Sequence, residues 1–351
     1  MDNVLRYFKN AAGKIGTVLD KTSSIFDNKD PLIILPYRGF ANEKHLYLKG
    51  RVLENENIFQ GKSNSEIRNL IDSFKRFETD EVGDAKVRIV IADQSWEVKT
   101  DHEGYFTLET DWTPTTTPVK KNIWIHAHLN LVTPRKEDGD AVNAIGEILL
   151  LASNADYGVI TDVDDTVLQT HVTSLFKLKM LYATFIKDAH QRLPMEGILE
   201  IFKKFEKGGD QKKMNPVFYV SNSPWNLYDL LEEFFKGQNF PKGPILLRDY
   251  GVNNSGPFSS HKMKIIAKIL ETYTELPFIF LGDTASKDAD FYIELAKQYP
   301  NRIKVIYIRK TKDNKNARRV AKLIENTTVV PVALIEDSSE IETDALKRGL
   351  F

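Results

Sequence analysis

The 351-residue sequence contains no cysteine, no long apolar run and no marked excess of either charge. The absence of cysteine excludes disulfide bridges, thiolate metal ligands and cysteine nucleophiles, and it fits a reducing compartment. Apolar runs such as IGEILLLA are far shorter than the roughly 20 residues that a membrane-spanning helix needs. The start, MDNVLRYFKN, lacks the pattern of a secretory signal. With a net charge of −1, we expect a cytoplasmic protein that binds no nucleic acid.

Length and composition predict more than one folded part. Hydrophobic residues make up 42% and charged residues 28% of the chain, so a sizeable core can form. A chain of 351 residues fits two domains, or one domain with a large appendage. We assign 1–30 to an N-terminal amphipathic helix, 31–155 to a β-rich domain of unknown role, 156–330 to an α/β domain and 331–351 to a C-terminal tail.

The first 30 residues carry a helical pattern. Between residues 4 and 26, apolar side chains recur at helical spacing, with basic residues among them. Two interpretations stay open: a helix packed on its own domain, which is the commoner case, and a helix that lies at a membrane surface.

Residues 31–155 are mostly β in texture. Segments 45–53, 85–100, 104–112 and 121–131 alternate apolar and polar residues and are rich in β-branched and aromatic types. One helix interrupts them, because Ser63 and Glu66 form a capping box before apolar positions that end at Phe77. We predict a small antiparallel sandwich with a helical insertion. His126 and His128 alternate onto one strand face, but the sequence shows no third metal ligand near them.

From residue 156 onward, five apolar runs alternate with helical stretches. The runs are YGVITD, PVFYVS, PILLRDY, PFIFLGD and RIKVIYIR, and the helices are expected near 172–207, 224–236, 262–274, 287–299 and 315–325. This alternation predicts a parallel sheet with helices on both faces, a Rossmann-like α/β fold. Ligands of such folds bind at the carboxyl ends of the strands, so the residues that follow each run are the candidates for chemistry.

Polar and charged residues collect at these strand ends. Asp162, Asp164 and Thr166 follow the first run, Ser221 and Asn222 follow the second, Lys262 begins the helix before the fourth, and Asp283 and Asp288 follow the fourth. An aspartate can attack phosphorus, and a second carboxylate two residues on can move the proton. Mg²⁺ prefers oxygen ligands that include one or two carboxylates. A hydroxyl and an ammonium offset charge on the phosphoryl oxygens.

Each of these pieces is ambiguous when taken alone. A D-x-D after a strand is common in loops and caps, SNS fits a turn, and a single lysine is usually a solvated helix residue. Their placement at successive strand ends of one sheet is what favours a phosphoryl-transfer site.

The order D-x-D-x-T, then Ser, then Lys, then G-D-x-x-x-x-D resembles the haloacid dehalogenase (HAD) superfamily of Mg²⁺-dependent phosphatases. More narrowly, DVDDTVLQT, YVSNSPWNLYDLLEEFF, FPKGPILLRDYG, HKMKIIAKIL and FLGDTASKDADFY resemble the catalytic domain of the actin-patch-type phosphatidate phosphatases and their bacterial relatives. The resemblance covers roughly residues 156–310 and implies a HAD-like sheet with flanking helices, preceded here by the β-rich domain.

The resemblance implies a role for each motif residue. Asp162 would be the nucleophile, Asp164 the general acid and base, Ser221 the phosphoryl-binding residue and Lys262 the stabilising cation. Asp283 would hold Mg²⁺ together with Asp162, Asp164 and Asp288, and Thr284 replaces a serine that is common in the family. Thr166, Asn222 and Arg248 are candidates for substrate contact. Trp225 fits either substrate contact or packing.

The family's substrate class is phosphatidate, which yields diacylglycerol and phosphate. The same chemistry on a soluble phosphomonoester, and a non-catalytic scaffold that binds a partner or membrane, stay open as alternatives. A lipid substrate requires peripheral membrane contact. Residues 172–193 follow the nucleophile loop and mix apolar and basic side chains. This segment fits either a membrane-facing cap or an ordinary sheet-covering helix.

Overall fold

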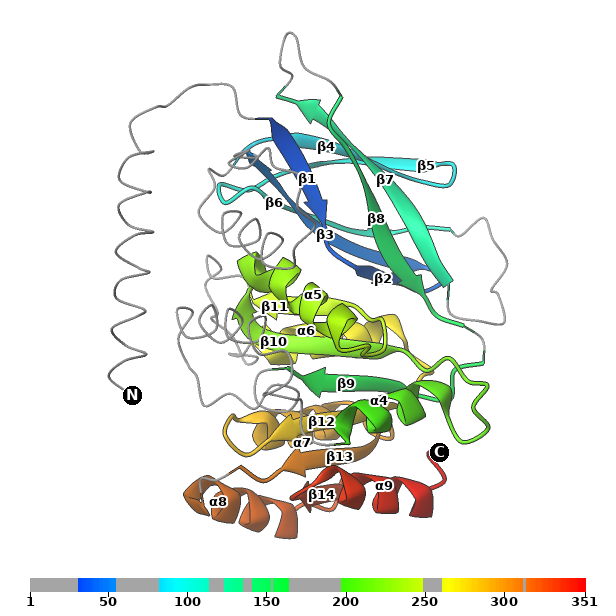
Figure 1. Ribbon diagram of the computed structural model, residues 1–351, viewed down its shortest axis with the longest axis vertical. Helices are drawn as coiled ribbons and strands as arrows, with labels where there is room; N and C mark the ends of the chain where they lie inside the picture. Colours follow the sequence, from blue (N-terminus) through cyan, green and yellow to red (C-terminus); the bar gives the residue numbers. More distant parts are fainter. Residues whose placement is uncertain are drawn as a thin grey trace.

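The computed structural model describes residues 31–54, 82–113, 123–134, 141–152, 154–163, 197–248, 261–311 and 314–351. The expected helices at 4–26 and 63–77, the segment 172–193, and Asp164, Asp165 and Thr166 lie outside these residues. Two sheets make up the described part, one above the other in Figure 1. The upper sheet is formed by the β-rich residues, and the lower one by the α/β residues.

The β-rich domain is one curled sheet of eight strands. They are β1 (Leu32–Pro36), β2 (Gly39–Ala41), β3 (His45–Glu54), β4 (Lys86–Ile91), β5 (Gln94–Lys99), β6 (Tyr105–Asp111), β7 (Ile123–Thr133) and β8 (Asn143–Leu150). Their order is β1-β3-β2-β8-β7-β4-β5, and β6 pairs with β3. The predicted strands are confirmed, and their apolar faces enclose a core that includes Leu48, Phe106, Ile89 and Leu129. The sheet is mixed, not purely antiparallel, because β2 lies parallel to β8.

The α/β domain contains a six-stranded sheet in the order β11-β10-β9-β12-β13-β14, and every pairing in it is parallel. The strands are β9 (Gly158–Asp162), β10 (Val217–Pro224), β11 (Ile245–Arg248), β12 (Phe278–Asp283), β13 (Ile303–Arg309) and β14 (Val332–Ile335). This confirms the predicted α/β fold. Its central strands β9 and β12 are buried along their whole length, as a sheet covered by helices on both faces requires.

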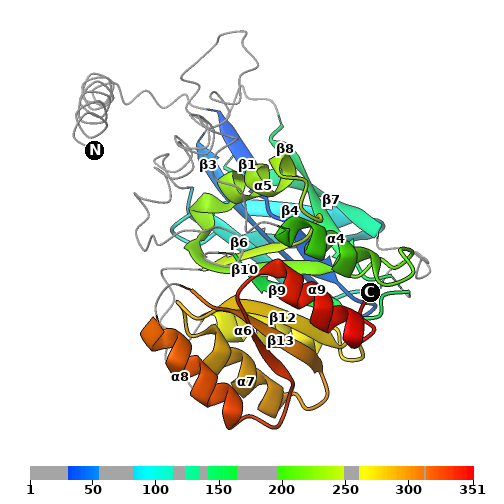
Figure 2. The same cartoon turned by 60° about the horizontal axis from the view of Figure 1, so that its bottom comes forward.

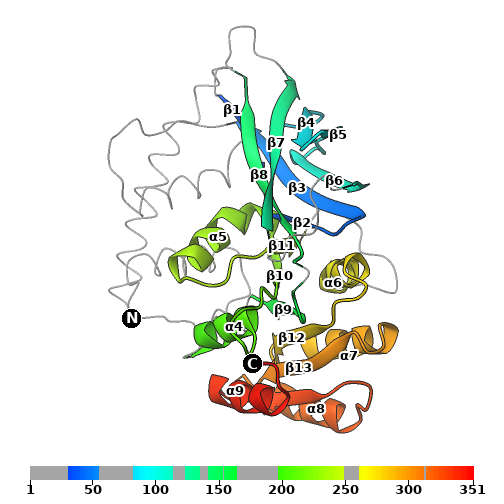
Figure 3. The ribbon, with the colours of Figure 1, turned by 90° about the vertical axis from the view of Figure 1, so that its right-hand side faces the viewer.

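Helices cover both faces of the parallel sheet. They are α4 (Ile198–Lys207), the short 3₁₀ turn η1 (Trp225–Leu227), α5 (Tyr228–Gly237), α6 (His261–Thr272), α7 (Asp288–Gln298), α8 (Asn314–Glu325) and α9 (Ser338–Lys347). In Figure 3, α4, α5 and α9 lie on one side of the strands and α6, α7 and α8 on the other. Within the described residues, no helix is long and apolar enough to cross a membrane.

Residues 331–351 are not a tail, in contrast to our expectation. They form the edge strand β14, which pairs with β13, and the helix α9, which lies beside α4 (Figure 2). Asp337 caps α9 by accepting hydrogen bonds from the backbone N–H groups of Ser339 and Glu340. The Tyr157 hydroxyl also donates to the carbonyl of Leu350 over 2.7 Å. The strand has only four residues, so its apolar pattern is too short to be recognised from sequence.

The two sheets share one core. Tyr37, Phe40, Tyr47 and Leu149 of the β-rich domain belong to the same buried cluster as the centre of the α/β sheet. The two domains therefore pack directly on each other.

Candidate active site

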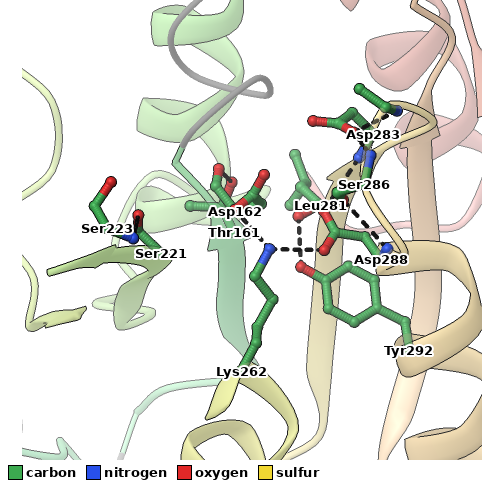
Figure 4. A network of polar contacts seen from close by, with 11 residues as sticks. Thr161, Asp162, Ser221, Ser223, Lys262, Leu281, Asp283, Ser286, Asp288 and Tyr292 are labelled. Carbon is green, nitrogen blue, oxygen red and sulfur yellow. Dashed lines mark hydrogen bonds and ion pairs between the residues drawn. The ribbon is translucent and has the colours of Figure 1, made fainter. Parts of the chain in front are cut away.

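Three adjacent strands of the parallel sheet bring their polar ends together. In the register of the sheet, Asp162 of β9 lies opposite Val220 of β10, and Thr161 lies opposite Leu281 of β12. Ser221 is the next residue along β10, and Asp283 lies two residues beyond Leu281 on β12, so both reach the same carboxyl edge as Asp162 (Figure 4). The structure confirms that this edge gathers these strand-end residues, as a parallel sheet requires.

Lys262 connects two of the carboxylates. It lies in the first turn of α6, and its Nζ is 2.7 Å from Asp162 Oδ1 and 2.7 Å from Asp288 Oδ1. All three side chains are at most 1% exposed. A lysine is rarely buried this deeply unless it is paired, so this bridge is a specific feature of the site. Lys262 is not the solvated helix residue that a single lysine in a sequence usually represents.

Asp162, Asp283 and Asp288 form a buried carboxylate cluster that could hold a metal ion. Each offers a carboxylate oxygen, and these three oxygens lie within 4.8 Å of one another. With all three ionised, the single positive charge of Lys262 leaves the cluster with a net charge of −2. Buried charge of this size is costly unless it is neutralised. A divalent cation with oxygen ligands would balance it, so the donor set and the charge both fit such an ion.

The loop after β12 explains why Asp283 and Asp288 are so close. Asp283 Oδ1 accepts hydrogen bonds from the backbone N–H groups of Ala285 at 2.7 Å and Ser286 at 2.9 Å, which turns the chain back toward the sheet. Asp288 then begins α7. A Cβ on Gly282 would lie only 2.7 Å from the Asp288 Cβ. The glycine is therefore required for the close packing of this loop.

Burial raises the pKa of the Asp288 carboxyl from 3.8 to about 8, with Lys262 acting in the opposite direction and Asp162 and Asp283 adding to the increase. A cation bound at the cluster would favour the ionised form. The ion and the proton therefore compete for this carboxyl, which links metal affinity to pH.

The other predicted site residues have varied positions. The Ser221 Oγ accepts a hydrogen bond from the Ser223 backbone N–H at 2.9 Å, and Asn222 between them is half-buried. Arg248 ends β11 in register with Pro224, so it lies at the same edge of the sheet. Trp225 is 2% exposed and stacks on the Tyr37 ring, which favours the packing interpretation. Asp164 and Thr166 lie outside the described residues.

Two side chains support the site through contacts that the sequence did not predict. Thr284 is fully buried, and its Oγ accepts a hydrogen bond from the Thr311 backbone N–H at 2.9 Å, which ties the loop after β12 to the end of β13. The Tyr292 hydroxyl of α7 donates to the Leu281 carbonyl at 3.0 Å (Figure 4). The spacing of Asp288 and Tyr292 places both on one face of a helix, but it does not indicate the contact with Leu281. His126 and His128 on β7 are exposed, and neither joins a metal-type cluster in the part of the chain described.

Comparison with known proteins places this domain. Residues 157–310 match the family described as "Phosphatidate phosphatase APP1, catalytic domain". The phosphatidate phosphatase APP1 of Saccharomyces cerevisiae is 35% identical over 156 residues, which is 43% of this chain and 25% of that protein. An uncharacterized protein of Schizosaccharomyces pombe is 29% identical over 263 residues, 72% of this chain and 41% of that protein. The chain therefore spans about a quarter to two fifths of the length of these relatives.

Among solved structures, a carbohydrate acetylesterase, XAC1771 of Xanthomonas citri, is 9% identical in sequence. The match covers 84% of this chain and 66% of the esterase chain, with a TM-score of 0.30. This score is too low to indicate a shared fold. The match over residues 157–310 coincides instead with the strands and loops that carry Asp162, Ser221, Lys262 and Asp283. Residues 157–310 of the α/β domain are thus similar to the family of the phosphatidate phosphatase APP1 catalytic domain.

Proposed function

We propose that this protein is an Mg²⁺-dependent phosphomonoesterase that works through an aspartyl-phosphate on Asp162 and hydrolyses phosphatidate to diacylglycerol and phosphate. The observation that carries the proposal is the Lys262 ammonium between Asp162 and Asp288, inside a buried three-carboxylate cluster at the carboxyl edge of the sheet. A structural ion pair alone does not need the third carboxylate, whereas phosphoryl transfer needs a nucleophile, a cation site and a stabilising ammonium together.

In the first step, a carboxylate oxygen of Asp162 attacks phosphorus and the ester oxygen leaves as an alcohol. Lys262 holds Asp162 Oδ1 at 2.7 Å, which fixes the orientation of the nucleophile. Asp164, two residues on along the chain, protonates the leaving oxygen. Because Asp162 is 1% exposed, bulk water is kept away from the carboxylate that has to react first.

In the second step, water attacks phosphorus in the aspartyl-phosphate, phosphate leaves, and the Asp162 carboxylate is regenerated. Asp164 accepts the proton of the attacking water, which reverses its first role. Ser221 donates a hydrogen bond to the phosphoryl group and Lys262 offsets its charge. Asp162, Asp164 and Asp283 would hold Mg²⁺, with Asp288 beside them, and the ion when bound would neutralise phosphoryl charge.

Phosphatidate is the best-supported substrate because residues 157–310 match a catalytic domain of that description. We assign Thr166, Asn222 and Arg248 to substrate contact at the carboxyl edge of the sheet.

A lipid substrate also requires contact with a membrane surface, and residues 4–26 and 172–193 are the proposed segments for it. Flotation with vesicles, with and without residues 1–26, tests the first segment: unchanged flotation of the shortened chain contradicts its role.

The substrate is tested by phosphate release from phosphatidate in mixed micelles and from a soluble aryl phosphate, with and without Mg²⁺. We expect release from phosphatidate that a chelator abolishes. Release only from the soluble ester would contradict the lipid assignment, and no release from either would contradict the enzymatic function itself.

A further inference from the structure

The β-rich domain contacts the segment that follows Ser221. After Ser221, Asn222 and Ser223, β10 ends at Pro224 and the chain enters η1 with Trp225. The indole ring of Trp225 stacks on the Tyr37 ring of the β-rich domain, with the centroids 4.9 Å apart and the planes at 14°. Tyr37 is 3% and Trp225 is 2% exposed, so the contact is dry. Only three residues therefore separate Ser221 from Trp225, a side chain that the other domain holds.

Ring contacts hold Trp225 in this place. Within the described part of the chain, its Nε1 is buried and has no hydrogen-bond acceptor. The Lys49 ammonium of β3 lies 5.4 Å from the centroid of its indole ring, within the range of a cation–π contact. The stack on Tyr37 and this contact with Lys49 both come from the β-rich domain, so the orientation of Trp225 depends on that domain.

The next turn of the same segment is held by the same part of the β-rich domain. The Tyr37 ring also lies 4.4 Å from the Tyr228 ring at the start of α5. The Tyr228 hydroxyl accepts a hydrogen bond from the Arg38 backbone N–H at 2.8 Å. The Arg38 guanidinium lies 2.6 Å from Glu232, one turn further along α5. Tyr37 and Arg38 thus brace the chain on the carboxyl side of Ser221 over two turns.

We propose that Tyr37 is a positioning residue of the active site: its stack on Trp225 fixes the loop that carries Ser221, so the β-rich domain is part of the phosphoryl-binding machinery. This inference rests on the proposed function, in which Ser221 binds the phosphoryl group. Binding groups have to be held close to their productive geometry, and a shift of about 1 Å can cost about 100-fold in rate. Tyr37 itself touches no reacting atom.

The test compares three variants of the full chain. Tyr37→Ala removes the stack, Tyr37→Phe keeps the ring and removes only the hydroxyl, and Ile89→Ala destabilises the β-rich domain in its own core. Ile89 is fully buried in the core cluster of the β-rich sheet and is absent from the cluster shared with the α/β domain. Each variant is assayed with Mg²⁺ and the better of the two substrates, well below its own thermal midpoint. Hydrogen–deuterium exchange is followed over residues 217–228.

We expect Tyr37→Ala to lower kcat/KM by about 10- to 100-fold and to speed up exchange in the Ser221–Leu227 segment. Tyr37→Phe should stay within about threefold of the wild type, as should Ile89→Ala despite its lower thermal midpoint. The inference is overturned if Tyr37→Ala loses no more activity than Ile89→Ala, or if Tyr37→Phe loses as much as Tyr37→Ala.

The exchange measurement separates this inference from the proposed function. A wild-type protein that releases no phosphate refutes the function, but exchange over residues 217–228 still reports the positioning. Faster exchange in Tyr37→Ala alone then supports it, and equal exchange in Tyr37→Ala and the wild type overturns it.

Discussion

Replacement of Lys262 by methionine would remove the ammonium between Asp162 and Asp288 and keep an apolar side chain of similar length. At 2.7 Å and an effective dielectric constant of about 20, each contact corresponds to about 6 kcal/mol of direct attraction, most of which is offset by desolvation. Removal of one partner of a buried ion pair typically costs about 3–5 kcal/mol in the free energy of unfolding. We expect a loss of this size in the metal-free variant.

The catalytic loss should be separable from the loss of stability. A group that stabilises developing charge in the transition state contributes about 10²- to 10³-fold to kcat, and we expect Lys262→Met to lower kcat by that factor with Mg²⁺ present. Calorimetry should show that Mg²⁺ still binds, because the three carboxylates remain. Lys264→Met is the matched control, since Lys264 lies on the same helix and is exposed. A kcat within tenfold of the wild type for Lys262→Met would refute the role of the ammonium.

Three further results are expected. Because the pKa of Asp288 is raised in the folded state from 3.8 to about 8, its contribution to stability is fully present below about pH 4 and is lost as pH rises through about 8. The thermal midpoint of the metal-free wild type should therefore fall between about pH 4 and about pH 8, and Asp288→Asn should flatten that fall, whereas equal slopes would contradict the assignment. Gly282→Ala should weaken Mg²⁺ binding by at least about tenfold in calorimetry, while Gly237→Ala, whose Cβ meets nothing within 4 Å, should not. Glu109→Gln should change the free energy of unfolding by less than about 1 kcal/mol in urea titrations, because its partner Lys268 is partly exposed; a larger loss would show that this ion pair holds the domains together.

The strand ends of the α/β domain could be predicted because the pattern is local. Each apolar run is a strand buried on both faces, and the residue that follows it reaches the carboxyl edge whatever the order of the strands. Asp162, Ser221 and Asp283 could therefore be assigned to one edge before their distances were known. Lys262 was harder to assign, because only the fold shows that the first turn of α6 lies against Asp162 and Asp288.

The features that escaped prediction depend on contacts between distant segments. The parallel pairing of β2 with β8 joins residues that lie about a hundred positions apart, and no local pattern encodes it. Strand β14 is short and lies at the sheet edge, so only its partner β13 reveals it as a strand. The stack of Tyr37 on Trp225 crosses the domain boundary. Neither ring carries a sequence signal for its partner, so the two interpretations of Trp225 could not be separated.

The central claim is that the Asp162 carboxylate becomes phosphorylated during turnover. The most direct measurement is to mix the Mg²⁺-loaded enzyme with substrate, quench within a turnover, reduce with borohydride and map the modified residue by peptide mass spectrometry. Borohydride converts an acyl phosphate on an aspartate into homoserine and leaves a free carboxylate unchanged. The proposed mechanism predicts homoserine at position 162 in the active protein and none without substrate. An active protein that shows an unmodified Asp162, or homoserine at another aspartate, would contradict it.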